Sequence, residues 1–132
     1  MKASHISGKR KASIAKATVK EGHGIVRINK ILLENYSNEV SRMKVMEPLL
    51  IAGDLSKKVN VNVSVAGGGF QSQAEAARLA IARALVNFSK DKALRQAFLD
   101  YDRHLLIADV RAAETSKPND SKPRAKRQKS YR

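Results

Sequence analysis

The clearest hydrophobic pattern of the chain lies in residues 59–65, where valine occupies every second position and Asn or Ser stands between. β-Branched apolar residues with a period of two are typical of a strand that buries one face. Three glycines, Gly67, Gly68 and Gly69, follow, and from Ala77 to Phe88 the apolar residues recur at helical spacing. The pattern predicts a strand, a three-glycine turn and an amphipathic helix that covers the valine face.

A second alternating stretch covers residues 13–20, where the apolar Ala15, Ala17 and Val19 are separated by Lys16, Thr18 and Lys20. Residues 25–29 alternate again, and Gly22 and Gly24 between the two stretches favour a turn. The pattern predicts a β-hairpin whose first strand has one apolar and one cationic face.

Residues 39–46 predict a short helix with Ser37 or Asn38 as its N-cap. Pro48 is expected to kink or restart this helix, because proline lacks the backbone donor that a helix interior needs. The two methionines of the segment are expected to fill the core.

Residues 92–100 predict a last short helix, and the apolar residues 105–107 are expected to tie the following segment to the domain. From residue 111 the chain has no aliphatic side chain larger than alanine and contains two prolines. Such a segment cannot bury enough surface to offset its ordering entropy. The sequence therefore predicts a globular domain over residues 1–110 and a basic tail over residues 111–132 that takes its structure from what it binds.

Positive charge is concentrated at the two ends of the chain, whose net charge is +14. Residues 1–30 carry eight basic residues and one acidic, residues 103–132 carry nine and three, and residues 31–102 carry nine and eight. Clustered cations repel one another unless a polyanion neutralises them, so a nucleic-acid partner is favoured over a merely solubilising charge. The sequence has no long apolar run, no leader pattern and no cysteine, so we expect a cytoplasmic protein without a membrane partner.

Catalytic or metal-binding chemistry is not predicted, because the three histidines are scattered and no cysteine is present. The three-glycine turn is the strongest cue for a phosphate site, but Phe70-Gln71-Ser72-Gln73 follows it in place of the Lys-Ser/Thr pair of a P-loop. Two interpretations of the glycines stay open: they only turn the chain, or they let a nucleic-acid backbone approach, with Gln71, Ser72 and Gln73 as neutral hydrogen-bond donors. We expect no enzyme activity, cofactor or metal.

Four segments of the chain, taken in order, carry a family resemblance. They are Gly8-Lys9-Arg10-Lys11 before Ala15-x-Ala17-x-Val19, Gly22-x-Gly24 before Val26-x-Ile28-Asn29, Gly67-Gly68-Gly69 with Gln73-Ala74-Glu75-Ala76 and Ile81-Ala82-Arg83-Ala84-Leu85, and Gln128-Lys129-Ser130-Tyr131-Arg132. Their order and spacing over almost the whole chain resemble the universal small-subunit ribosomal protein family nine. The last segment is similar to the archaeal and eukaryotic form of that family's tail, so an archaeal source is expected.

This resemblance implies an α+β fold: a two-layer α/β sandwich in which helices cover one face of a mixed sheet, with an extended basic C-terminal tail. It also implies a structural component of the small ribosomal subunit whose partners are rRNA of the subunit head, P-site tRNA and neighbouring small-subunit ribosomal proteins. In the family the end of the tail approaches the anticodon stem-loop of the tRNA, so the tRNA-binding role falls to Lys129, Tyr131 and Arg132.

The charge pattern and the resemblance together predict the residues that contact rRNA. They are Lys9, Arg10, Lys11, Gly67, Gly68, Gly69, Gln71, Ser72 and Arg78 in the domain, and Lys122, Arg124, Lys126 and Arg127 in the tail. Contacts to the RNA backbone position a protein without reading base sequence. Residues 71–73 and 110–116 depart from the family's usual pattern, and no rRNA contact is carried over to residues 110–116.

Two other functions fit parts of the pattern. A free RNA- or DNA-binding architectural protein or chaperone would share the basic ends, and salt would steeply weaken its binding. An enzyme of RNA metabolism would need a carboxylate or histidine pair at the glycine turn, where Glu75 stands alone and Arg78 is expected to pair with it at i+3.

Overall fold

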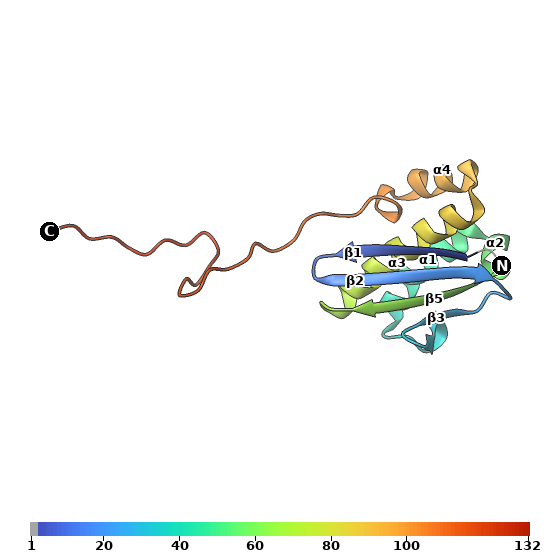
Figure 1. Ribbon diagram of the computed structural model, residues 1–132, viewed down its shortest axis with the longest axis horizontal. Helices are drawn as coiled ribbons and strands as arrows, with labels where there is room; N and C mark the ends of the chain where they lie inside the picture. The colour runs from blue at the N-terminus through green and yellow to red at the C-terminus, as the bar shows by residue number, and fades with distance from the viewer. Residues whose placement is uncertain (1–2) are drawn as a thin grey trace.

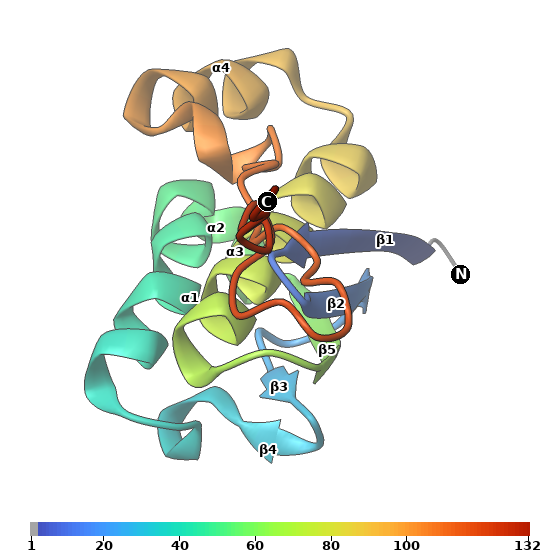
Figure 2. The ribbon, with the colours of Figure 1, turned by 90° about the vertical axis from the view of Figure 1, so that its left-hand side faces the viewer.

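Five strands form one mixed sheet in the computed structural model, which describes residues 3–132, and the helices lie on one face of that sheet (Figures 1 and 2). The strands are β1 (Ala3–Arg10), β2 (Ser13–Glu21), β3 (Val26–Ile28), β4 (Ile31–Leu32) and β5 (Val59–Ala66). The helices are α1 (Glu39–Ala52), α2 (Asp54–Lys57), α3 (Phe70–Ser89) and α4 (Lys92–Tyr101), with 3-10 turns at Leu33–Asn35 and Arg103–Leu105. The predicted α+β class and mixed sheet are confirmed.

The strands run in the order β1-β2-β5-β3-β4. β1, β2 and β5 pair antiparallel, β3 pairs parallel to β5, and β4 pairs antiparallel to β3. Helix α3 packs on β1, β2 and β5, and α1 packs beside α3. The opposite face of the sheet has no helix over it (Figure 2).

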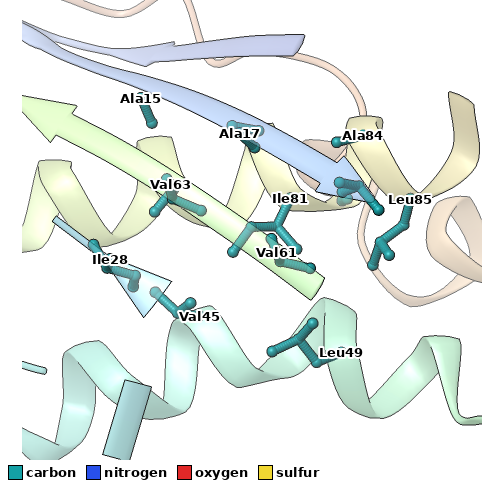
Figure 3. Packing of buried hydrophobic residues seen from close by; sticks show 14 of the residues in the cluster. Ala15, Ala17, Ile28, Val45, Leu49, Val61, Val63, Ile81, Ala84 and Leu85 are labelled. Atoms are coloured by element: carbon teal, nitrogen blue, oxygen red, sulfur yellow. The ribbon is translucent and has the colours of Figure 1, made fainter. Parts of the chain in front are cut away.

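The predicted valine strand is β5, and its inward side chains form the centre of the core (Figure 3). Val61 and Val63 meet Ile81 of α3, while Ala15 and Ala17 of β2 leave room for the helix to approach. Each buried valine contributes roughly 1.5–3 kcal/mol. Helix α3 begins at Phe70, directly after the glycine turn and before the point where its apolar spacing becomes visible in the sequence.

The first strand, β1, was not predicted, because its inward positions do not show the regular alternation of large apolar residues that marks a strand. Ser4 and Gly8 are buried at positions where a strand ordinarily has large apolar residues. A Cβ at Gly8 would lie 2.7 Å from the carbonyl oxygen of Ala76 and 2.9 Å from the nitrogen of Ala80 in α3. The helix therefore lies so close to β1 that the strand needs small residues, which hides the alternation.

The predicted hairpin between β2 and β3 is wrong, because β5 lies between the two strands. The connection crosses the start of β5 and gives its backbone donors to that strand: Gly22 N to Lys58 O at 2.9 Å and Gly24 N to Val59 O at 3.1 Å. The side-chain oxygen of Asn60 accepts from His23 N and Ile25 N at 2.9 and 3.1 Å. Hydrogen bonds to a strand distant in sequence thus replace those of a hairpin.

Helix α1 starts as predicted, with the Asn38 side chain accepting from Ser41 N at 2.9 Å. Pro48 lies inside the helix and neither ends nor restarts it, since α1 continues to Ala52. The expectation that its methionines fill the core is wrong: Met43 is 57% exposed and Met46 40%. The buried face of α1 instead consists of Ser41, Val45, Pro48 and Leu49, of which Val45 and Leu49 face Ile28 and Val61 (Figure 3).

The segment after α3 confirms the predicted short helix as α4, whose N-cap Asp91 accepts from Ala93 N at 2.8 Å. Phe98 and Leu105 are fully buried and tie this segment to the domain. Ile107 is exposed, so the predicted anchoring by residues 105–107 rests on Leu105 with a half-buried Leu106.

Candidate nucleic-acid interface

The two-residue turn between β1 and β2 lies against the three-glycine turn, which brings two predicted binding segments together. Ser13, directly after the first turn, has its hydroxyl 2.8 Å from Gly67 O and 2.8 Å from the Ser72 hydroxyl. Gln73 donates from its side chain to Gly67 O at 3.0 Å. Lys11 in the first turn is exposed, so its ammonium is carried at the same corner of the domain as the glycines.

The three glycines of this corner have different structural roles. Gly67 and Gly68 have φ angles of 81° and 63°, and a Cβ at Gly67 would lie 2.5 Å from Ala12 O. These two glycines therefore turn the chain and let the β1–β2 turn pack closely. Gly69 has open space where a Cβ would stand, and its N–H meets the Ser72 hydroxyl at 3.2 Å. Gln71 is exposed beside it, so the Gly69 end of the turn is open to a nucleic-acid backbone from outside.

Arg10 is held inside a network at the end of β1 instead of facing solvent. Its side chain is 14% exposed, and it contacts Glu75 of α3 at 2.8 Å and Asp109 at 3.5 Å. It also donates to the backbone oxygen of Arg111 at 2.7 Å. Lys44 of α1 reaches the other oxygen of Glu75 at 3.2 Å. Arg10 thus ties the strand, helix α3 and the start of the tail to one another.

The pKa values of the carboxyl groups reflect this network. Burial raises the pKa of Glu75, but the hydrogen bonds and charges of Arg10 and Lys44 outweigh burial and leave the pKa below its ordinary value. The pKa of Asp109 lies well below its ordinary range, chiefly because Arg111 donates to it from side chain and backbone, with a further effect from the charge of Arg10. Both carboxyl groups of the network are therefore ionised at neutral pH.

Arg78 has a similar position on the neighbouring face of α3. It contacts Glu47 of α1 at 2.5 Å and Asp102 after α4 at 3.1 Å, and its side chain is 14% exposed. The expected i+3 pair between Glu75 and Arg78 is therefore wrong, because each finds a partner from another element. The charges of Arg10 and Arg78 are balanced inside the domain, and their predicted rRNA contacts stay predictions.

The tail leaves the domain beside this network and projects far beyond it (Figure 1). Residues 106–132 contain no helix or strand, and Arg83 holds the start of this stretch by donating to Leu106 O at 2.8 Å. Within the tail, Arg124 pairs with Glu114 at 2.5 Å, while Lys122, Lys126, Arg127, Lys129 and Arg132 have no ion pair among the described residues. Tyr131 is 88% exposed. The predicted tail residues are thus presented to solvent along a chain without helix or strand, which turns at Pro118 and at Pro123.

No group of three His, Cys, Asp or Glu side chains within residues 3–132 is arranged to hold a metal ion. Across the same residues, no helix has the length and apolar character needed to cross a membrane.

Comparison with known proteins gives the family. The sequence model of the family described as ribosomal protein S9/S16 matches residues 8–132. The chain belongs to this family. It is 48% identical over 134 residues to the small ribosomal subunit protein uS9 of Methanococcus maripaludis strain C7, and the alignment covers 100% of each chain. The same protein of strain C5 is also 48% identical over 134 residues, again with 100% of each chain covered.

Family membership makes the protein a structural component of the small ribosomal subunit, with rRNA and other ribosomal proteins as partners, on the cytoplasmic ribosome. The predictions of a ribosomal role and of a non-enzymatic protein are confirmed. The relatives come from an archaeon, in agreement with the archaeal form of the tail's ending.

One group of exposed cations on the sheet comes from separate strands and was not predicted as a group. Lys16 and Arg27 project from β2 and β3 on the face that no helix covers, and Lys30 follows in the β3–β4 turn. The alternation of lysine with small apolar residues in β2 was the signal for this cationic face, but only the strand order shows that cations from separate strands lie together.

Proposed function

We propose that the folded domain docks on small-subunit rRNA and that the tail extends from it to P-site tRNA. The observation that carries the proposal is the exposed basic tail, whose start is fixed to the domain through Arg10 and Arg83. A fixed start and a free, cationic end suit a chain that crosses packed RNA to reach a distant partner.

The length of the tail is sufficient for such a role. Fully extended, residues 111–132 span roughly 70 Å. Pro118 and Pro123 each lie in a turn, closed by Asp120 N donating to Lys117 O at 3.4 Å and Ala125 N donating to Lys122 O at 3.1 Å. They also remove two backbone hydrogen-bond donors, which disfavours a helix. The tail can therefore lie as a thin strand between RNA helices, where each Lys or Arg neutralises phosphate.

The proposal divides the binding residues between the two RNAs. Lys9, Lys11, Gly67, Gly68, Gly69, Gln71 and Ser72 at the corner of the domain, with Lys122, Arg124, Lys126 and Arg127 in the tail, are assigned to rRNA. Lys129 and Arg132 contact the tRNA backbone, and the exposed ring of Tyr131 stacks on a nucleotide. Arg10 and Arg78 are assigned a supporting role, because their guanidinium groups contact carboxylates of the domain.

The test uses small subunits reconstituted with the full-length protein. Changing Lys129→Gln together with Arg132→Gln is expected to speed tRNA release from the P site by about tenfold, which corresponds to some 1.4 kcal/mol of lost binding. The matched control, Lys122→Gln with Arg124→Gln, removes the same charge from the rRNA-binding part of the tail. It is expected to weaken retention of the protein on the subunit while tRNA release changes little.

Two outcomes would overturn parts of the proposal. Unchanged tRNA release in the Lys129 and Arg132 variant would remove the tRNA role and leave the tail as an rRNA anchor. Equal effects of the two variants on tRNA release would show that the tail acts only through overall charge.

A further inference from the structure

One face of the sheet carries no helix. We call it the open face and define it by His5, Lys16, Thr18, Arg27, Lys30 and Asn62. Strand register places His5 beside Thr18, Thr18 beside Asn62, and Asn62 beside Arg27, so one row crosses four strands. Lys16 lies one position further along the same side of β2. Together these residues line a shallow hollow of about 840 Å³.

The cations of the open face have no carboxylate partner. Lys16, Arg27 and Lys30 form no ion pair within the described part of the chain, whereas Arg10, Lys44 and Arg78 on the helix side all do. The one acidic residue of the strands, Glu21, stands opposite Val59 and so has the phase of the buried side of β2. The positive charge of the open face is therefore uncompensated.

The face is also held rigidly. His5 Nδ1 lies 2.8 Å from the Thr18 hydroxyl across two strands. Asn29 and Lys30 form the two-residue turn after β3, with φ angles of 49° and 70°. The side chain of Asn29 accepts from Val65 N at 2.8 Å and donates to Val65 O at 3.0 Å, which fixes the turn that carries Lys30. The backbone that carries these side chains therefore needs little ordering when the face binds a partner.

We infer that the open face is a second RNA-docking surface, which binds the phosphate backbone and 2′-hydroxyl groups of a double-helical rRNA segment. The face has no Phe, Tyr or Trp on which a base could stack, and its three cations suit phosphates. Thr18 and Asn62 supply neutral groups that suit 2′-hydroxyls, which the wide, shallow minor groove of A-form RNA displays. A protein partner fits less well, because the core of a protein interface is depleted in charge.

This inference rests on the ribosomal assignment of the chain and is independent of the tail's contact with tRNA. It adds a surface formed by four strands and a turn to the docking corner at the glycine turn. Two separate contacts to RNA fix the orientation of a domain, which a single corner does not.

The test compares two triple variants of the full-length protein with equal loss of charge. The first changes Lys16→Gln, Arg27→Gln and Lys30→Gln. The control changes Lys90→Gln, Lys92→Gln and Arg95→Gln, which line a separate hollow on the helix side and also include one lysine with positive φ. Binding to a short RNA duplex of fixed sequence is measured against salt concentration, with thermal melts to confirm that both variants fold.

For the open-face variant we expect the slope of log affinity against log salt to fall in magnitude by about 2 to 3, because each phosphate contact contributes about 0.9 to the slope. We also expect the affinity at low salt to drop tenfold or more. The control is expected to change the slope by less than about 1. Equal changes in the two variants would overturn the inference.

Lysine acetylation of the assembled subunit gives a second readout. Lys16 and Lys30 are expected to be protected and Lys90 and Lys92 to react. Full reactivity of Lys16 and Lys30 would overturn the inference. The inference would also be overturned if these lysines were protected in the subunit while the isolated open-face variant bound RNA as well as the unchanged protein, because that result assigns the face to a protein partner. A failed tRNA-release experiment with an intact salt effect would reject the tail proposal alone.

Discussion

Basic residues have opposite surroundings in the domain and in the tail. Arg10 and Arg78 each contact two carboxylates, and each side chain is only 14% exposed. In the tail, Arg124 is 87% exposed and meets one glutamate, and the cations beyond it form no ion pair in the described chain. The same residue type therefore joins elements of the fold in one region and is available for phosphates in the other. Charge in a sequence shows that a partner is expected, but not which cations meet it.

The energies of the two kinds of site should differ accordingly. Removing one member of a largely buried ion pair leaves its partner uncompensated and costs far more than removing an exposed pair, which contributes about 0–1 kcal/mol. Substitutions in the domain and in the tail can therefore separate stability from binding.

The largest effect is expected for Arg78→Met. The change leaves Glu47 and Asp102 without their shared cation, and we expect the free energy of unfolding to fall by about 2–3 kcal/mol. Urea unfolding followed by circular dichroism measures this. Arg95→Met on the exposed surface of α4 is the control and is expected to change stability by less than about 0.5 kcal/mol. Similar values for the two variants would show that the network around Arg78 does not stabilise the domain.

A smaller effect is expected for Glu75→Gln, and it should depend on pH. The folded-state pKa of Glu75 is lowered, so its contribution is present above the ordinary value of about 4.3 and is lost as pH falls through the folded pKa. At pH 7 the variant should lose roughly 1 kcal/mol, because the group is partly exposed. The difference between the two proteins should shrink as pH falls below about 4.3 and vanish only below the folded-state pKa of Glu75. Unfolding curves from pH 7 to pH 3 test this, with the exposed Glu39→Gln as control, and a difference that does not shrink as pH falls would contradict the electrostatic explanation.

The smallest effect on stability is expected from removing the tail. Deleting residues 112–132 keeps the Arg111 carbonyl that Arg10 binds and removes no buried hydrophobic residue. The melting temperature should change by no more than about 2 °C, whereas retention of the protein on the small subunit should fall clearly. A large drop in melting temperature would show that the tail packs on the domain and contributes to its free energy of unfolding.

Much of the fold was predictable from neighbouring residues. The valine alternation of β5, the Asn38 cap of α1, the short helix α4 and the tail without large aliphatic residues all agree with the structure. Periodicity, capping and composition act over a few residues, so the sequence shows them directly. For the candidate site, the sequence likewise indicated two basic ends and a three-glycine turn.

Only the tertiary structure decided which of these segments meet. β5 separates β2 from β3 and replaces the expected hairpin. β1 is a strand because it pairs with β2 along its whole length, and its inward Ser4 and Gly8 are small because α3 lies close to them. Packing against Ile28 and Val61 sets the buried face of α1, which leaves Met43 and Met46 exposed.

The partners of the arginines depend on the tertiary structure for the same reason. Arg10 binds Glu75, which is 65 positions away, and the backbone of Arg111, which is 101 positions away. Each of these arginines pairs with a carboxylate that is close in space, and the two groups come close only when the helices and strands pack together. The sequence thus determined the elements and the sign of the charge, while packing determined which cations stabilise the domain and which remain free for RNA.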